Sequence, residues 1–224
     1  MSGAPHDAAL PARIAAWVRA VAPAGVAVAV DRVGPAAPFD AAEAAVVARA
    51  GAGRRDTFAT GRRLARAALF ELGAMPGSLP ADDDGVPRWP AGFMGSISHA
   101  DGLCIALAGR AGDLAGIGVD LERAERVVPA LARRICRVDE SNPGDAAVLA
   151  LRFAAKEAVF KAYFPSTRCR LGFQDVHVAI APASDRFEVR LACTARPALG
   201  SRRAFDGRLA RFGHHVVAGV WVAR

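Results

Sequence analysis

Lysine, cysteine and tyrosine are scarce in this chain of 224 residues. Only two of its 29 basic residues are lysines, Lys156 and Lys161, and it has four cysteines and one tyrosine. The cysteines form no CxxC or CxxH pair, so nothing supports a zinc site or thioredoxin-like chemistry, and we expect buried, reduced thiols. With one tyrosine and no alternation of basic and aromatic residues, the sequence does not favour a nucleic-acid-binding surface.

Long apolar runs are also missing. Val21–Val30 and Val216–Ala223 stop well short of the roughly 18 residues that a membrane-spanning helix needs. The first residues carry neither the basic leader nor the apolar core of a secretory signal. With 53% hydrophobic and 23% charged residues the chain is not globally disordered. We therefore predict a soluble, cytoplasmic protein with no membrane partner.

The expected elements follow a similar order twice along the chain. In the first half they are a strand at Val26–Val33, helices at Ala41–Ala50 and Arg62–Leu72, and strands at Phe93–His99, Leu103–Ala108 and Ala115–Leu121. In the second half they are a helix from Ala146 to Tyr163, stopped by Pro165, and strands at Gly172–Ile180, Phe187–Thr194, Phe205–Phe212 and His215–Ala223. A helix followed by an antiparallel meander, twice, predicts an α+β fold of two similar lobes, a pseudo-dimer. We expect lobes at residues 1–122 and 146–224, joined by a connecting segment at 123–145.

The segment from Ala115 to Glu122 has the clearest pattern for chemistry. In a strand, one face holds Ile117, Val119 and Leu121, and the other holds Gly116, Gly118, Asp120 and Glu122. Two carboxylates on one face suit Mg²⁺, which takes one or two carboxylates together with substrate phosphates. The glycines would let a ligand come close to the backbone. The alternative, slightly favoured for this segment alone, is an edge strand with charged residues on its solvent side.

A second candidate is the helical segment around Glu157. Glu157 and Lys161 lie one turn apart on one helix face, and Lys156 is next to them. A carboxylate between two ammonium groups could complete a metal site while the lysines hold phosphate oxygens. The alternative for this segment alone is a solvated helix face.

Two further groups point to an anionic ligand. Ser98 and His99 end a strand before a tight turn, and because the chain has no Gly-x-Ser-x-Gly elbow, a hydrogen-bonding Ser98 and a phosphate-contacting His99 explain them better than a hydrolase. Arg62 and Arg66 share a helix face near Arg54, where like charges repel unless an anionic or acidic group meets them. A phosphorylated ligand and nucleic acid would both explain the arginines.

Together these segments resemble the Sfp-type 4′-phosphopantetheinyl transferases, in particular the bacterial siderophore branch typified by the enterobactin enzyme. The matching residues are Arg54-Arg-Asp-Thr-Phe58, Gly61-Arg62, Ala65-Arg66-Ala-Ala-Leu69, Gly85-x-Pro87-x-Trp-Pro90, Gly95-Ser-Ile-Ser98-His99, Gly118-Val-Asp120-Leu-Glu122, Phe153-Ala-Ala-Lys156-Glu157 through Lys161-Ala, and Leu171-Gly-Phe173. The Gly-x-Asp-x-Glu and Lys-Glu-x-x-x-Lys pair is the family's signature. The chain departs from the family at Val86, where relatives often carry Lys, and at the acidic run Asp82–Asp84.

The resemblance implies transfer of the phosphopantetheine arm of coenzyme A to a carrier-protein serine, with release of adenosine 3′,5′-bisphosphate. It implies two α+β lobes with the active site between them. Metal ligands for Mg²⁺ would be Asp120, Glu122 and Glu157, with the Leu121 backbone nearby. Lys161 and His99 would contact the phosphates, with Lys156 close to them, while Arg54 and Arg62 would lie near the adenosine end, Ser98 beside the nucleotide and Leu171 at the adenine. Glu157, directly or through a metal-bound water, is the candidate base, so the catalytic residues would be Glu157, Lys161 and His99.

The implied partners are coenzyme A and acidic acyl or peptidyl carrier proteins of siderophore, nonribosomal peptide or polyketide synthesis, with the enzyme itself a monomer. A basic enzyme would be steered toward an acidic carrier. We therefore hypothesise that Arg133, Arg134 and Arg137 help to dock the carrier, although they fit equally a set of solvated arginines. The alternatives for the whole chain are a non-catalytic module that binds coenzyme A and, on charge alone, a basic nucleic-acid-binding protein.

Overall fold

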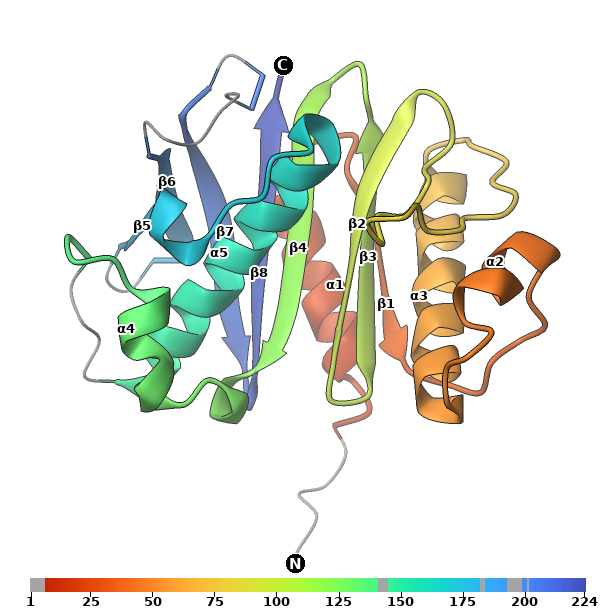
Figure 1. Ribbon diagram of the computed structural model, residues 1–224, viewed down its shortest axis with the longest axis horizontal. Coiled ribbons are helices and arrows are strands. Elements are labelled where there is room, and N and C mark those ends of the chain that lie inside the picture. Colours follow the sequence, from red (N-terminus) through yellow and green to blue (C-terminus); the bar gives the residue numbers. More distant parts are fainter. Residues whose placement is uncertain (1–6, 141–144, 182–183, 193–198, 201) are drawn as a thin grey trace, which may run out of the picture.

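Two antiparallel sheets lie side by side in the computed structural model, which describes residues 7–140, 145–181, 184–192, 199–200 and 202–224 (Figure 1). Among these residues, one sheet has the strand order β1-β3-β2 and the other has the order β4-β8-β7-β6-β5. The strands are β1 (Ala27–Arg32), β2 (Phe93–Ala100), β3 (Leu103–Arg110), β4 (Leu114–Arg123), β5 (Val176–Ile180), β6 (Arg186–Leu191), β7 (Ala204–Phe212) and β8 (His215–Ala223). The α-helices are α1 (Leu10–Val21), α2 (Ala41–Val46), α3 (Ala52–Glu71), α4 (Ala132–Ile135) and α5 (Ala146–Thr167). Short 3₁₀ turns are η1 (Ala124–Arg126), η2 (Pro129–Leu131) and η3 (Phe173–Asp175).

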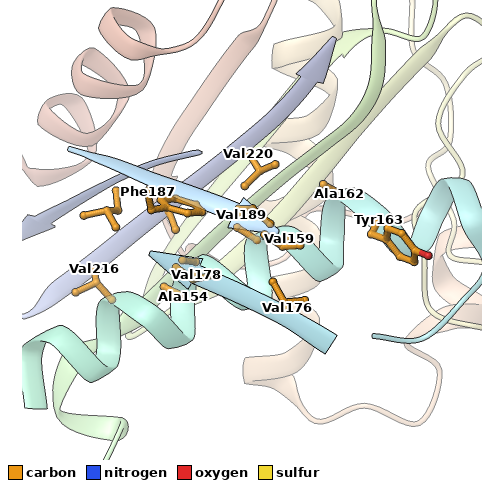
Figure 2. Packing of buried hydrophobic residues seen from close by; sticks show 14 of the residues in the cluster. Ala154, Val159, Ala162, Tyr163, Val176, Val178, Phe187, Val189, Val216 and Val220 are labelled. Carbon is orange, nitrogen blue, oxygen red and sulfur yellow. The ribbon is translucent and has the colours of Figure 1, made fainter. Parts of the chain in front are cut away.

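Each sheet carries its own long helix. Because strand side chains alternate between faces, β3 presents small residues such as Cys104 and Ala106 to Leu64 and Leu69 of α3. Its other face packs on α1, where Ile14 and Val18 recur at helical spacing. In the second lobe, α5 lies across the five-stranded sheet, and Figure 2 shows side chains of the helix meeting those of the strands, namely Ala154, Val159, Ala162, Tyr163, Val176, Val178, Phe187, Val189, Val216 and Val220.

Several expected elements differ from the structure. The sequence prediction missed α1, although Leu10, Ile14 and Val18 lie at i, i+4 and i+8. Helix α5 does not stop before Pro165 but continues to Thr167, and it ends at Arg168, which has a positive φ of 57°. Thr194, the expected end of one strand, lies outside the described residues. Within the described part of the chain, no helix combines the length and apolarity needed to cross a membrane.

Strand β4 lies in a different sheet from the one that we expected. It pairs with β8 of the five-stranded sheet, whereas β2 and β3 pair within the other sheet. Two serine hydroxyls of β2 accept hydrogen bonds from backbone N–H groups of β4, as backbone carbonyls would in a continuous sheet. Ser96 Oγ accepts from the Val119 N–H at 3.0 Å, and Ser98 Oγ accepts from the Leu121 N–H at 3.1 Å. The edge of β4 that does not pair with β8 is thereby covered by β2. The division of the lobes at residue 122 stays a prediction, and the pairing of β4 favours an earlier boundary.

Candidate active site

The face of β4 that carries Asp120 is turned toward α5. A Cβ atom on Gly118 would lie 2.0 Å from the Ala158 carbonyl oxygen, and one on Gly116 would lie 2.7 Å from that of Ala162. The space above these glycines is therefore occupied by the helix backbone. Our expectation that a ligand approaches there is wrong, because the glycines serve close packing of the helix on the strand.

Asp120 and Lys161 form the centre of the site. Lys161 Nζ lies 2.7 Å from Asp120 Oδ1 and 2.8 Å from Ser98 Oγ, which itself donates to Asp120 Oδ1 at 2.9 Å. Asp120 is only 6% exposed, so the alternative of an edge strand with solvated charges is excluded. Ser98 uses its donor on Asp120 and accepts from Leu121 and Lys161, which fills its hydrogen-bonding capacity. Its hydroxyl thus joins the two lobes, and the place of Ser98 beside the nucleotide stays a prediction.

Two further carboxylates, those of Glu122 and Glu157, interact electrostatically with Asp120. Burial raises the pKa of Glu157, and the negative charges of Asp120 and Glu122 raise it further. The pKa of Glu122 is also raised, first by burial and then in part by Asp120. The three predicted acids are thus electrostatically coupled in one region between β4 and α5. Leu121 lies between two of them with its side chain 1% exposed in the core.

A cavity of about 360 Å³ opens beside this network and is lined by both lobes. The predicted residues Arg54, Arg62, His99 and Lys161 line this first cavity, together with the loop Asp84–Pro87 and with Phe160 and Arg170. Arg54 Nη1 donates to His99 Nε2 at 3.1 Å. Burial, and then the positive charge of Arg54, lowers the pKa of His99, so the ring is neutral at pH 7. Most of the charged residues that line this cavity are arginine or lysine, which suits an anionic ligand.

Arg62 and Arg66 have an internal counter-ion that the sequence analysis missed. Glu43 of α2 is 1% exposed and accepts from Arg66 at 2.5 and 3.4 Å and from the Leu79 N–H at 2.9 Å. Arg62 stacks on the ring of Phe58 at 4.2 Å and donates to the Leu79 carbonyl at 2.5 Å, and burial lowers its pKa to about 10. These contacts explain the paired arginines without nucleic acid. Nothing in the local sequence indicated this pair, because Glu43 and Arg66 lie 23 residues apart.

A second cavity of about 280 Å³ lies on the other side of Phe160 and Arg170, which line both. Glu157, Leu171, Phe173 and Arg134 of α4 contribute to its wall. Leu171, predicted at the adenine, therefore lies in a different cavity from Arg54 and Arg62. A larger groove of about 530 Å³ lies on the outer face of β6 and β7, and its lining contains none of the three coupled carboxylates.

Comparison with known proteins identifies the family of this chain. Residues 42–109 match the 4′-phosphopantetheinyl transferase N-terminal domain, and residues 116–218 match the 4′-phosphopantetheinyl transferase superfamily. The 4′-phosphopantetheinyl transferase Svp of Streptomyces mobaraensis is 38% identical over 192 residues, which are 81% of this chain and 77% of Svp. The chain belongs to the 4′-phosphopantetheinyl transferase superfamily.

Two further relatives agree with this membership. The transferase PptT of Mycobacterium tuberculosis is 38% identical over 61% of this chain and 63% of its own length, and Npt of Nocardia iowensis is 33% identical over 61% and 64%. The predicted family, α+β fold and enzyme class are confirmed, and the siderophore branch stays a prediction. This transferase is a holo-carrier-protein synthase of the Sfp type, which moves the phosphopantetheine of coenzyme A to a carrier protein.

Lys156 of the transferase does not lie where the resemblance placed it. Its side chain is 1% exposed, and Nζ donates to the Ile135 carbonyl, to Glu140 Oε2 and to the Phe173 carbonyl at 2.8, 2.8 and 2.9 Å. An ammonium group has three N–H donors. All three are used inside the protein, so the prediction that Lys156 lies close to the phosphates is corrected.

The acidic run of the transferase faces the second lobe. Asp82 lies 2.7 Å from Arg168, and Asp84 lies 3.4 Å from Arg168 and 3.5 Å from Arg170. The negative charges that seemed unsuited to a phosphate site are therefore neutralised by arginines after α5. Residues 84–87 of this loop line the first cavity.

Proposed function

We propose that the transferase uses Mg²⁺ held by Asp120, Glu122 and Glu157. The supporting observation is the coupling of the three carboxylates: the pKa values of Glu122 and Glu157 are raised first by burial and then by the negative charge of neighbouring carboxylates. Oxygen ligands of this kind suit a hard cation. In the described part of the chain no three His, Cys, Asp or Glu side chains gather closely enough to hold an ion, and Asp120 is paired with Lys161. The donor chemistry fits, and bound Mg²⁺ would neutralise and orient the pyrophosphate of coenzyme A. The Leu121 backbone stays a proposed neighbour of the ion.

The two cavities suit the two ends of coenzyme A. The first cavity, with Arg54, Arg62, His99 and Lys161, suits the nucleotide and its phosphates. The second, walled by Phe160, Leu171 and Phe173, suits the uncharged pantetheine chain. Because both cavities share Phe160 and Arg170, one extended ligand can occupy both.

In the proposed reaction, the carrier serine loses its proton to Glu157, and its Oγ forms a bond to the β-phosphorus of coenzyme A. The bond from that phosphorus to the oxygen of adenosine 3′,5′-bisphosphate breaks, and the leaving group keeps the electron pair. Lys161 and His99 would bind the phosphate oxygens on which charge builds. The nucleophile comes from the partner, so no serine of this chain is needed.

The direct test is to incubate the protein with coenzyme A, Mg²⁺ and an apo carrier protein and to weigh the carrier. A mass gain of one phosphopantetheine supports the function. Binding of coenzyme A without a mass gain would favour the non-catalytic module. Carriers from siderophore, nonribosomal peptide and polyketide systems, tested in parallel, would show which pathway the enzyme serves.

Binding of Mg²⁺ should depend on pH. Glu122 and Glu157 keep their protons to a higher pH than ordinary carboxyls, and protons compete with a cation. We expect 10 mM MgCl₂, roughly a saturating concentration for a weak site, to raise the melting temperature more at pH 8 than at pH 5.5. Sodium chloride of equal ionic strength is the control. A shift of the same size at both pH values would contradict these residues as ligands.

Docking of the acidic carrier is proposed at α4. Arg133 and Arg134 are exposed there, between Val128 and Val138, whose exposed fractions are 46% and 104%. Arg134 also lines the second cavity, which links this surface to the reaction. Arg137 contributes less than predicted, because its guanidinium pairs with Asp139 and donates to the Gln174 carbonyl.

Reversing these charges tests the docking surface. We expect R133E/R134E to raise the KM for the carrier about tenfold while coenzyme A binding stays unchanged, because charge complementarity mainly controls encounter. The matched control is R186E/R190E on the outer face of β6, which removes the same charge elsewhere. Equal effects of the two double variants would show that only net charge matters.

A further inference from the structure

Lys156 connects three segments that are separate in the sequence. From the middle of α5 its ammonium group reaches the Ile135 carbonyl at the end of α4, Glu140 in the following turn, and the Phe173 carbonyl in η3. The residue is 2% exposed, and burial lowers its pKa while Glu140 opposes that effect. A buried charge with every donor satisfied is tolerated only in a well-fixed geometry.

Glu140 extends the same connection. Its side chain is 0% exposed and accepts from the Val178 N–H of β5 at 2.6 Å and from the Arg137 N–H at 2.8 Å, in addition to Lys156. The Lys156–Glu140 pair thus ties α4, the turn after it and the start of β5 to α5. Without Lys156, Glu140 would keep the more distant Arg152, whose Nε lies 3.9 Å from Oε2, as its charged partner, and without Glu140 the Lys156 ammonium group would be buried with no counter-ion among the described residues.

The segments held by this pair are the walls of the second cavity. Arg134 lies next to Ile135 on one side, and Leu171 and Phe173 lie on the other, while Glu157 and Phe160 of α5 lie between them. The carbonyls that Lys156 holds belong to Ile135 and Phe173, one from each wall. The ammonium group therefore helps to set the spacing of the two walls, together with Gln174 of η3, whose Nε2 donates to the Arg134 and Cys136 carbonyls at 3.1 Å.

We propose that Lys156 is a positioning residue, which sets the width of the second cavity and so the placement of the pantetheine chain. This inference rests on the proposed division of coenzyme A between the two cavities. It assigns Lys156 no contact with phosphate. The first cavity, whose lining does not include Lys156, keeps its shape when the lysine is changed.

The test compares two ligands in Lys156→Met, which keeps an unbranched side chain one atom shorter and removes the three donors. Adenosine 3′,5′-bisphosphate reports on the first cavity, and coenzyme A reports on both. We expect the dissociation constant of coenzyme A to rise about tenfold or more and that of adenosine 3′,5′-bisphosphate to stay within about twofold. Glu140→Gln should shift the same ratio, because the walls are held by the pair, and Lys156→Arg should recover part of it.

A control variant that also destabilises the fold separates a general loss of stability from a specific effect on the second cavity. Leu103→Ala removes a buried side chain in the other core and should leave the ratio of the two dissociation constants unchanged. Weaker adenosine 3′,5′-bisphosphate binding in Lys156→Met would make Lys156 a phosphate ligand and overturn the proposal. An unchanged ratio in both Lys156→Met and Glu140→Gln would overturn it as well. If the wild-type protein fails to bind coenzyme A, the proposed function itself fails, which is a different result.

Discussion

Glu157→Gln is expected to lower the rate of phosphopantetheine transfer at least about 10²-fold while raising the melting temperature of the ligand-free protein. The amide keeps the shape of the side chain but can neither accept the serine proton nor bind Mg²⁺ as a carboxylate does. Stability should rise because the charged form of Glu157 is disfavoured by burial and by Asp120 and Glu122. A carboxyl whose pKa is raised on folding costs stability once pH exceeds its unfolded value. The gain should therefore be larger at pH 8 than at pH 5.

The matched control is Glu188→Gln, an exposed glutamate on the outer face of β6. It should change neither the rate nor the melting temperature. Transfer is measured as the mass gain of an apo carrier, and melting is followed in the absence of Mg²⁺ and coenzyme A. A melting temperature that falls in Glu157→Gln, or transfer that persists at the wild-type rate, would remove Glu157 from the proposed site.

Gly118→Ala should destabilise the fold by at least about 3 kcal/mol, because it overpacks a contact between backbones. The new methyl group would lie 2.0 Å from the Ala158 carbonyl oxygen and 2.7 Å from the Ala162 backbone nitrogen. Neither atom can turn aside as the end of a flexible side chain could. Strand β4 and helix α5 would have to separate, and with them Asp120 and Lys161.

Urea denaturation measures this loss, and Gly112→Ala is the control. Gly112 lies in the turn before β4, and a Cβ added there meets no atom within 4 Å. It should change the free energy of unfolding by less than about 1 kcal/mol. A loss of that small size in Gly118→Ala would mean that β4 and α5 are less closely packed than they are here.

The chemistry of the site could be predicted from the sequence where it depends on local spacing. Alternation along β4 placed Ile117 and Val119 in the core and Asp120 on the opposite face, which the structure confirms. The four-residue spacing of Glu157 and Lys161 predicted a shared helix face, and in the structure both interact with Asp120 of β4. Those patterns follow from strand and helix geometry alone.

Other residues depend on partners far away in the chain. Glu43 meets Arg66 from 23 residues away, and nothing in the local sequence names that partner. Ser98 was interpreted only as a ligand contact. Its hydrogen bonds to Leu121 and Lys161 could not be predicted, because they form only when the two sheets meet. Lys156 and Glu157 are neighbours in sequence, but about 100° of helical turn separates a lysine paired with Glu140 from a carboxylate coupled to Asp120.

By itself the sequence determined which acids and cations this transferase has and which of them share a strand or a helix face, because periodicity is a local property of the backbone. Only the tertiary structure decided that β4 leaves the first meander for the second sheet. It also decided that α5 fills the space above the glycines and that Lys156 points into the protein. These outcomes depend on packing and on buried charges finding partners between distant segments, and neither is written in the spacing of neighbouring residues.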